Sequence, residues 1–271
     1  MPDRGSQVSG AKEQSPREAF RNTGPEAIAA DLAVLGVAPG DTVLVHSSFK
    51  SLGPVAGGME SVVRGFLHAI GPDGTLMMPA LTWALRPPEI FDVRRTPVNV
   101  GAIPEYFRNR EGTRRSLHPT HSVCATGPRT GELLDGHLRD TTPCGPRSPF
   151  RKNVETGGKI VLLGCGLGPN TTMHALEEYV KPPYLFGRRC VFTLRDHDGR
   201  THRRAYTTHG FRDHGYVQRY DRVREVLGEP HLRRGWVLRA ETWVLDASAL
   251  KTAAVPKLRE YPLFFVEPRT A

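Results

Sequence analysis

The stretch Leu163–Tyr179, LGCGLGPNTTMHALEEY, predicts a strand, a turn and a helix in succession. Residues 159–163 are short, apolar and β-branched near their start, which is typical of a buried parallel strand. Glycines and a proline interrupt this pattern before the helix. Asn170 or Thr171 is the expected N-cap, because a short side-chain oxygen accepts hydrogen bonds from the first helical turn. We expect a ligand site here, since open α/β sheets bind ligands at the carboxyl ends of their strands.

Three side chains of this predicted helix suit acid–base chemistry. His174, Glu177 and Glu178 lie at helical spacings of three and four, so both carboxylates fall on the side of the imidazole. Either carboxylate could orient the ring or share its proton, and the sequence leaves open which one does. The pattern favours a general base, although solvated glutamates beside a partly buried histidine would give the same spacing.

Composition limits the class of protein. The 271 residues suffice for one large α/β domain, and 38% hydrophobic with 24% charged residues is ordinary for a soluble enzyme. The chain has no apolar run long enough to span a membrane. Residues 1–20 lack the apolar core of a secretory signal and are predicted to be a disordered polar tail before a domain over 21–271. Four widely spaced cysteines without a C-x-x-C pair argue against a zinc ribbon or disulfide scaffold and favour reduced thiols in a cytoplasm.

The net charge of +9 predicts an affinity for anions, such as nucleic acid or the phosphates of a nucleotide cofactor. No helix-turn-helix, zinc-finger or RNP pattern is present, so we do not expect nucleic acid as a partner. Lys50, Arg114 and Arg115 are weak candidates for contacts with phosphate.

The rest of the chain alternates strand and helix patterns. Strands are expected over residues 42–46, 75–79, 122–126, 237–244 and 263–266. Helices are expected over residues 25–37, 59–70, 102–108, 131–138, 216–227 and 247–259. Residues 191–194 and 202–207 flank a D-G turn and predict a β-hairpin. Residues 80–100 form a long irregular segment that we expect to lie over the sheet.

Two polar clusters lie next to predicted strands. Ser47–Gly53 follows the first strand, where hydroxyls and loop N–H groups can hold phosphate or amide oxygens. The second cluster, R-R-S-L-H-P-T-H-S, ends at Ser122. Its two histidines cannot both sit on a regular helix because a proline separates them. The cluster either presents His121 and Ser122 to a ligand or simply uses His118 and its proline to shape a turn.

The order of these motifs is specific, although each motif alone is weak. V-H-S-S-F-K-S-L-G, G-T-L-M-M-P, T-P, L-H-P-T-H-S-V, S-P-F and G-x-N-T-T-M-H-A-L-E-E follow one another along the chain. Together they resemble the aminoglycoside 3-N-acetyltransferase family, the antibiotic N-acetyltransferases that are distinct from the GNAT fold. The resemblance runs from about Ala27 to Phe265, which is nearly the whole chain.

The resemblance implies a single three-layer α/β/α domain, to which the patterns above add a central, largely parallel sheet and a β-hairpin. It also implies transfer of acetyl from acetyl-CoA to the 3-amino group of a 2-deoxystreptamine aminoglycoside. In the family the histidine of the T-T-x-H helix is the general base, and here it is His174. The residues implied to bind CoA are His46, Ser47, Ser48, Ser51, Leu52, Gly53, His121 and Ser122.

This chemistry agrees with the residue types. A substrate ammonium must lose a proton before it attacks a thioester, and an imidazole beside a carboxylate can take that proton. The oxyanion that forms needs donors, for which Ser47, Ser48 and Thr172 are candidates. Transfer would be direct, so Cys165 is expected to be a small buried residue and not a nucleophile.

The chain departs from the family in two respects. It has Thr207-Thr208-His209 where some members carry an acidic residue, so His209 is a further candidate for the site, although it could equally be a surface histidine at the end of the hairpin. Its positive charge also repels polycationic aminoglycosides, although salt screens that field within about 8–10 Å. An acidic acceptor pocket would have to draw on Asp92, Glu105, Glu177, Glu178 and Asp213.

Three other functions remain open at this stage. The enzyme could acylate another amine in a biosynthetic pathway, or the chain could be a catalytically silent CoA binder. A metal-dependent hydrolase with His118, His121, His174 and Glu178 as zinc ligands is disfavoured because no H-E-x-x-H motif is present. We expect a small-molecule amine as partner and no metal, and the sequence leaves homodimer formation open.

Overall fold

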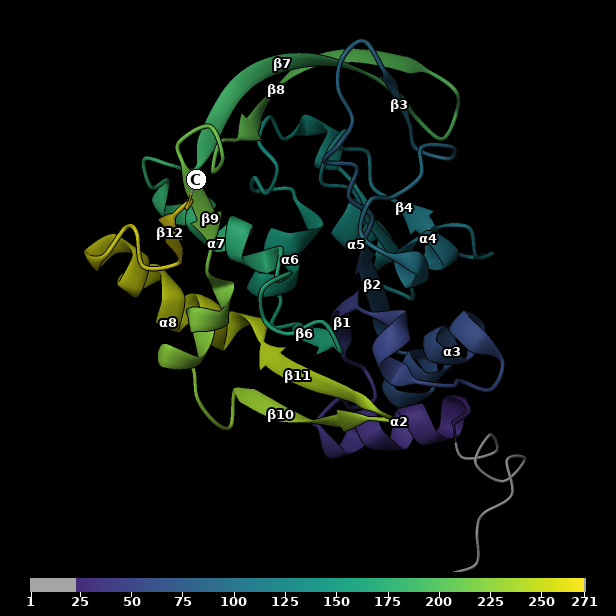
Figure 1. Cartoon of the computed structure of the whole chain (residues 1–271). Coiled ribbons are helices and arrows are strands. Elements are labelled where there is room, and N and C mark those ends of the chain that lie inside the picture. Colours follow the sequence, from purple (N-terminus) through teal and green to yellow (C-terminus); the bar gives the residue numbers. More distant parts are fainter. Residues whose placement is uncertain (1–22, 271) are drawn as a thin grey trace, which may run out of the picture.

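The computed structural model describes residues 23–270, so the predicted tail over residues 1–20 lies outside the described residues. A seven-stranded sheet crosses the molecule in the order β10-β11-β6-β1-β2-β5-β4 (Figure 1). Its strands are β1 (Thr42–Ser47), β2 (Thr75–Pro79), β4 (Arg114–Arg115), β5 (Val123–Thr126), β6 (Lys159–Leu163), β10 (Leu232–Val237) and β11 (Ala240–Asp246).

The sheet is mixed, and the prediction of a largely parallel sheet is therefore wrong. Only β1 is parallel to both of its neighbours, β2 and β6, whereas the outer strands join in antiparallel pairs. The stretch 237–244, predicted as one strand, is divided by a tight turn between β10 and β11. Leu238 takes a φ of 52° in this turn, and its N–H donates to Asp31 Oδ2 at 2.8 Å. Such a short connection can only join antiparallel strands.

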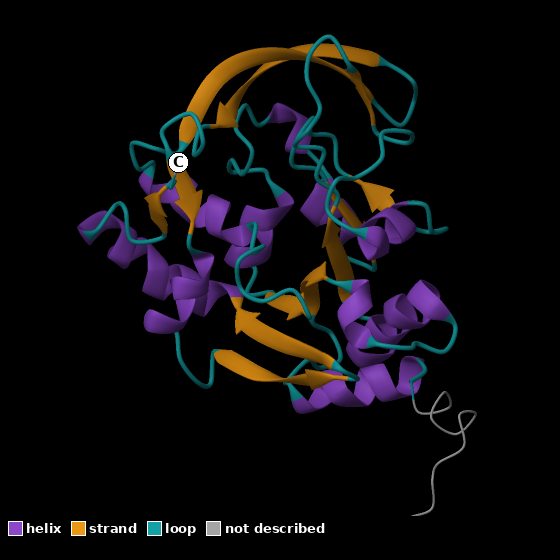
Figure 2. Cartoon of the chain, in the orientation of Figure 1, coloured by secondary structure: helices purple, strands orange, loops and turns teal. Residues whose placement is uncertain are grey.

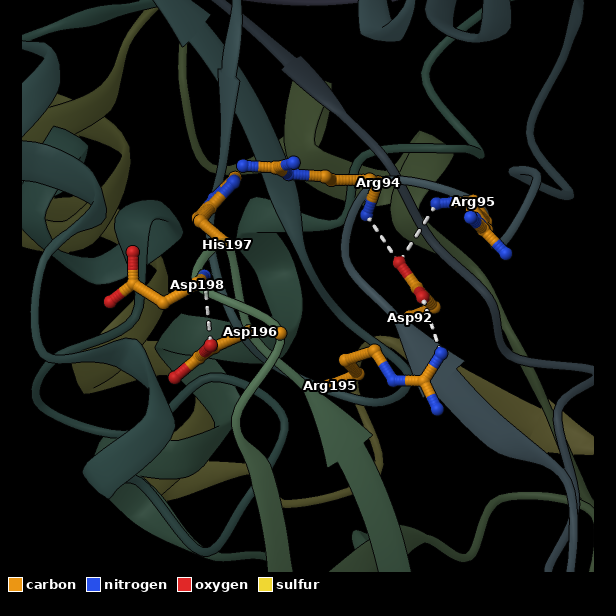
Figure 3. Close-up of a pocket in the computed structure, with 8 residues that line it drawn as sticks. Asp92, Arg94, Arg95, Arg195, Asp196, His197 and Asp198 are labelled. Carbon is orange, nitrogen blue, oxygen red and sulfur yellow. Dashed lines mark hydrogen bonds and ion pairs between the residues drawn. The ribbon is translucent and has the colours of Figure 1, made fainter.

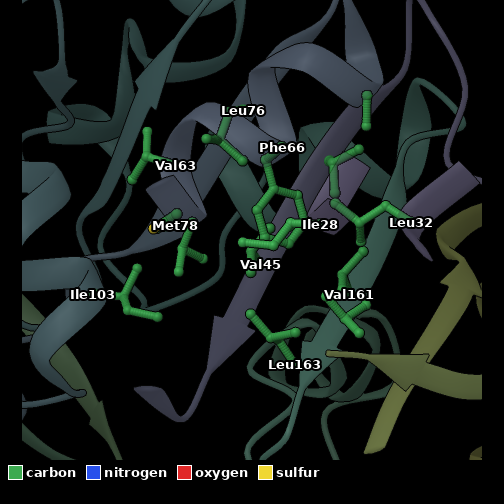
Figure 4. Close-up of a cluster of buried hydrophobic side chains, with 14 of the residues drawn as sticks. Ile28, Leu32, Val45, Val63, Phe66, Leu76, Met78, Ile103, Val161 and Leu163 are labelled. Carbon is green, nitrogen blue, oxygen red and sulfur yellow. The ribbon is translucent and has the colours of Figure 1, made fainter. Parts of the chain in front are cut away.

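Helices cover both faces of this sheet (Figure 2). On one face lie α2 (Pro25–Val34), α3 (Gly58–Ile70) and α4 (Ala102–Arg108). On the other lie α5 (Thr130–Leu134), α6 (Pro149–Glu155), α7 (Thr172–Val180) and α8 (Ala247–Glu260). Side chains alternate along β1 as a pleated strand requires, with Val45 packed toward α2 and α3, and Leu44 toward α5 and α6. Figure 4 shows Ile28, Leu32 and Phe66 in the first of these cores.

A second sheet arches over the top of the molecule (Figure 1). It consists of β3 (Ile90–Asp92), β7 (Phe186–Arg195) and β8 (Thr201–His209), with β3 parallel to β7. The predicted β-hairpin is confirmed, and it is longer than expected at both ends. The irregular segment over 80–100 packs against it through β3, and Phe91 of that strand is fully buried.

Several boundaries differ from the predictions for identifiable reasons. The helix expected over 216–227 is instead β9 (Tyr216–Gln218), paired with β12 (Val266–Pro268), and the 3₁₀ turn η3 (Tyr220–Glu225). The helix expected over 131–138 stops after α5, and Gly136, with a φ of 86°, leads into the 3₁₀ turn η2 (His137–Arg139). Helix α6 was not predicted, although Ser148 and the proline after it form a standard helix start.

The helices predicted over 59–70, 102–108 and 247–259 are confirmed. None of the helices within residues 23–270 combines the length and apolar character that crossing a membrane requires. All four cysteines are free thiols.

Candidate active site

The two predicted ligand loops meet at one edge of the sheet. Strands β1 and β6 are parallel neighbours, and their last residues, Ser47 and Leu163, are register partners. The N–H of Ser48 donates to the carbonyl of Leu163 at 2.8 Å, which ties the loop after β1 to the end of β6. Asn170 Oδ1 accepts from the N–H of Thr172 at 3.2 Å where α7 begins. The loop that contains the 3₁₀ turn η1 (Phe49–Leu52) is therefore held at the end of β6, and a Cβ on Gly164, just after β6, would collide with the Ser51 side chain.

His174 projects from the first turns of α7 and is held at one ring nitrogen. Its Nδ1 lies 2.7 Å from the hydroxyl of Tyr220 and 3.2 Å from Oε2 of Glu177. The Tyr220 hydroxyl also lies 2.8 Å from that same Oε2. Because a carboxylate only accepts hydrogen bonds, the Tyr220 hydroxyl donates to Glu177 and its oxygen accepts from Nδ1–H of His174. This arrangement leaves the lone pair on Nε2 of His174.

Glu177, and not Glu178, is the carboxylate in contact with His174. The Glu177 side chain is completely buried and also accepts from the hydroxyl of Tyr184 at 3.0 Å. Burial and the neighbouring Glu177 raise the pKa values of Tyr184 and Tyr220. Both phenols therefore stay protonated and serve as donors to this carboxylate.

Glu178 faces the other way along α7 and anchors a loop. It accepts from the Thr142 hydroxyl at 2.6 Å and from the Cys144 N–H at 2.7 Å. Its Oε1 also lies 3.5 Å from Nε2 of His209. Burial raises the pKa of Glu178. Glu178 therefore lies beside His209. The sequence left open whether His209 belongs to the site or is a surface residue at the end of the hairpin.

Two further histidines surround His174. The ring centroid of His174 is 4.4 Å from that of His209 and 5.9 Å from that of His121, and those two rings are 5.0 Å apart. Burial, followed by the charge of neighbouring histidines, lowers the pKa values of His121 and His209 well below the usual value. His46 behaves similarly, with a pKa of about 3 that follows from burial and then from the charge of His174.

Cavities open on two sides of this group. The larger has a volume of about 590 Å³ and includes His121, His209, Phe211 and Asp213 in its wall. The smaller, of about 320 Å³, includes His46, Ser47 and Thr171. His174 is adjacent to the lining of both, because it packs against His121 and His209 and interacts electrostatically with His46.

Some of the residues implied to bind CoA shape the loops instead of lining a cavity. Leu52 is buried in the core, and the Ser51 hydroxyl donates to the Ser48 carbonyl at 2.7 Å. Gly53 has a φ of 74°, which favours glycine as η1 ends. Ser122 is fully buried, and its hydroxyl donates to the Ala80 carbonyl at 2.7 Å.

By contrast, the His46 Nε2 and the Ser47 hydroxyl are buried without a hydrogen-bond partner. They line the smaller cavity and remain available to a ligand there.

The basic residues proposed for phosphate are largely engaged elsewhere. Arg115 is buried and donates to the Ser122 hydroxyl and the Ala80 carbonyl, and burial lowers its pKa to about 10. Arg114 forms an ion pair with Asp135 at 2.8 Å. These two arginines therefore stabilise the fold around β4 and β5.

The acidic residues also divide between sites. Asp213 lines the larger cavity together with His209. Asp92 lies in a separate cavity at the hairpin end, where it accepts from the N–H groups of Arg94 and Arg95 (Figure 3). Glu105 is paired with Arg108.

Tyr220 and Tyr184 are site residues that sequence reasoning missed. Tyr220 lies 46 residues after His174 in a segment predicted as a polar helix, and no spacing rule joins the two positions. Only the tertiary contact between η3 and α7 reveals the pair.

Comparison with known proteins identifies the family of this chain. Residues 44–259 match the family model described as aminoglycoside 3-N-acetyltransferase. The chain is 32% identical over 237 residues to aminoglycoside N(3)-acetyltransferase IV of Salmonella sp, covering 86% of this chain and 87% of that protein.

Two solved structures are also similar. A mutant of aminoglycoside acetyltransferase AAC(3)-IVa in complex with gentamicin superposes with a TM-score of 0.78 and 30% identity, covering 89% of this chain and 90% of that one. The binary complex of AAC-IIIb with CoASH gives a TM-score of 0.76 and 27% identity, covering 88% of this chain and 96% of that one. The chain therefore belongs to the aminoglycoside 3-N-acetyltransferase family.

Proposed function

We propose that this protein transfers the acetyl group of acetyl-CoA directly to an amine, with His174 as the general base. The observation that carries the proposal is an imidazole placed beside two cavities, with Nδ1 held by Tyr220 and Glu177. The acceptor is the 3-amino group of a 2-deoxystreptamine aminoglycoside. Membership of the family supports this choice, as do the structures of AAC-IIIb with CoASH and of AAC-VIa bound to sisomicin.

In this mechanism the substrate enters as an ammonium and loses a proton to Nε2 of His174. The free amine attacks the thioester carbonyl, the C–S bond of the tetrahedral intermediate breaks, and the proton lost by the acylated nitrogen neutralises the departing CoA thiolate. Glu177 stabilises the imidazolium that forms, because it lies 3.2 Å from Nδ1. Positioned proton transfer of this kind contributes about 10²–10⁴-fold in rate.

The smaller cavity suits the acyl donor. The Ser47 hydroxyl lies there without a partner and can donate to the oxyanion that develops on the thioester carbonyl. The N–H of Ser48 is already bonded to Leu163, which leaves Ser47 and the unpartnered Thr172 hydroxyl as donors. A thiol nucleophile is disfavoured, since burial raises the pKa of Cys165 to about 12.

The test measures release of CoA thiol from acetyl-CoA with a panel of aminoglycosides. We expect His174→Ala to lower kcat by about 10²–10⁴-fold while acetyl-CoA still binds in calorimetry. His68→Ala is the matched control, because His68 lies on the exposed side of α3. Full activity in His174→Ala would remove this residue from the mechanism.

A second acceptor class is favoured by the charge of the larger cavity. Arg86, Arg188 and Arg212 line it, against the single carboxylate of Asp213. Such a wall attracts an amine that also carries a carboxylate or phosphate, and it disfavours a polycation. The same assay therefore includes anionic amines. Turnover with these alone, with a KM that rises with salt, would identify a different acceptor while leaving the role of His174 intact.

A further inference from the structure

A three-histidine cluster lies beside the larger cavity, and two of its members, His121 and His209, line that cavity. His121 precedes β5, His174 lies on α7 and His209 ends β8. One ring nitrogen from each lies within 4.8 Å of the other two. Among residues 23–270, these three side chains form the group of potential metal ligands. Of the four zinc ligands considered from the sequence, His118 and Glu178 lie outside this group, and His209 joins it.

The hydrogen bonds around these rings leave nitrogen lone pairs available to the cluster. Nδ1 of His174 is bonded to Tyr220 and Glu177, and Nδ1 of His121 lies 2.9 Å from the Thr120 hydroxyl. In both rings these hydrogen bonds involve Nδ1, and Nε2 takes no part in them. Metal-binding histidines usually have their second nitrogen fixed in this way, often by a carboxylate.

His209 adds an independent observation. Its Nε2 is buried without a hydrogen-bond partner, and Oε1 of Glu178 lies 3.5 Å from it. An unpartnered buried polar atom costs free energy, so its persistence in this position points to a ligand. The closest ring contact of His209 within the cluster, 4.4 Å between centroids, is with His174.

We propose that His121, His174 and His209 form an inhibitory binding site for a divalent transition metal, with Zn²⁺ as the best match. Neutral imidazoles suit zinc, and three protein ligands leave the fourth tetrahedral position open, here toward the larger cavity. Tetrahedral geometry at usual Zn–N lengths needs nitrogens about 3.4 Å apart. The three ligand nitrogens now lie within 4.8 Å of one another and would have to approach to that separation when the metal binds.

Metal binding would inhibit the enzyme because one ligand, His174, is also the proposed general base. The inhibitory role therefore rests on the proposed function. A lone pair on Nε2 of His174 that binds a metal cannot accept the proton of the acceptor ammonium. The metal and the amine substrate would then compete for one imidazole. Free Zn²⁺ should suppress acetyl transfer, and a chelator should restore it.

The test measures metal binding without relying on turnover. The full-length chain, stripped with EDTA, is dialysed against Zn²⁺ and analysed for bound metal, and Co²⁺ serves as a spectroscopic probe of tetrahedral coordination. We expect one ion per chain, with affinity lowered at least about tenfold in His121→Gln and in His209→Gln. His231→Ala is the control, since that exposed residue pairs with Asp246 elsewhere on the surface.

Urea unfolding of each variant establishes that it is folded, and stabilisation of the unmodified chain by Zn²⁺ gives a second readout that needs no variant. The site would be overturned if no metal binds, or if both glutamine variants bind Zn²⁺ as tightly as the unmodified chain. Stoichiometric binding without inhibition of an active enzyme would overturn its inhibitory role. A chain that binds Zn²⁺ as expected but acetylates no amine retains the metal site and refutes the proposed acetyl transfer.

Discussion

At the scale of single residues, the chain of contacts from Tyr184 through Glu177 and Tyr220 to His174 should govern catalysis. The Tyr220 hydroxyl touches both Nδ1 of His174 and Glu177, whereas the Tyr184 hydroxyl touches only Glu177. We therefore predict that Tyr220→Phe lowers kcat by roughly tenfold, because a hydrogen bond to a group that becomes charged is lost, and leaves KM for acetyl-CoA unchanged. Tyr184→Phe should lower kcat by a smaller factor. Steady-state kinetics of both variants provide the measurement, and equal losses would assign the effect to packing around Glu177.

The sequence could predict the part of this site that one helix carries. The spacing of His174, Glu177 and Glu178 placed both carboxylates near the imidazole, but a small change in helical phase exchanges their roles. Only the positions of Tyr220 and Thr142 in the folded chain decide it, since one bonds Glu177 and the other Glu178. These partners come from loops distant in sequence, where local patterns carry no information.

At the scale of elements, α2 and α3 pack closely against each other on one face of the sheet. Gly65 lies where a Cβ would approach Ile28 to 2.5 Å and the Pro25 carbonyl to 3.2 Å. We predict that Gly65→Ala lowers the free energy of unfolding by about 1–3 kcal/mol, because overpacking outweighs the better helix propensity of alanine. Urea unfolding measures this. Arg64→Ala, on the exposed side of the same helix, should change stability by less than about 0.5 kcal/mol, and equal stability of the two variants would contradict tight packing here.

Local signals also explain which elements were predictable. Helices α3 and α8 have strong turn or strand signals at their boundaries and were assigned correctly. The antiparallel direction of the outer strands was not predicted, because it depends on the end of the sheet at which the chain re-enters it. Likewise, Tyr216–Gln218 belongs to the segment predicted as a helix over residues 216–227, yet pairing with β12 makes it a strand. Tertiary pairing overrides local propensity in such short segments.

At the scale of the whole molecule, buried histidines should make stability depend steeply on pH. Burial lowers the folded-state pKa of five of them, namely His46, His118, His121, His137 and His209. The unfolded chain binds protons at these positions near pH 6.5, whereas the folded chain does not. Stability that is present above pH 6.5 is therefore lost as the pH falls, by up to about 1.4 kcal/mol per pH unit for each histidine.

Two buried carboxyls act in the opposite direction over part of this range. Burial raises the pKa of Asp140 to about 6 and also raises that of Glu178, so the folded chain protonates there before the unfolded chain does. Five histidines against two acids still give a net loss of stability between pH 6.5 and 5. Urea unfolding at half-unit pH steps should show that slope. His137→Gln, at a residue that lines neither cavity, should reduce the slope by the contribution of up to one bound proton. A flat or rising stability on acidification would mean that these imidazoles are already protonated in the folded chain, and a metal ion at His121 and His209 would then have to compete with that proton.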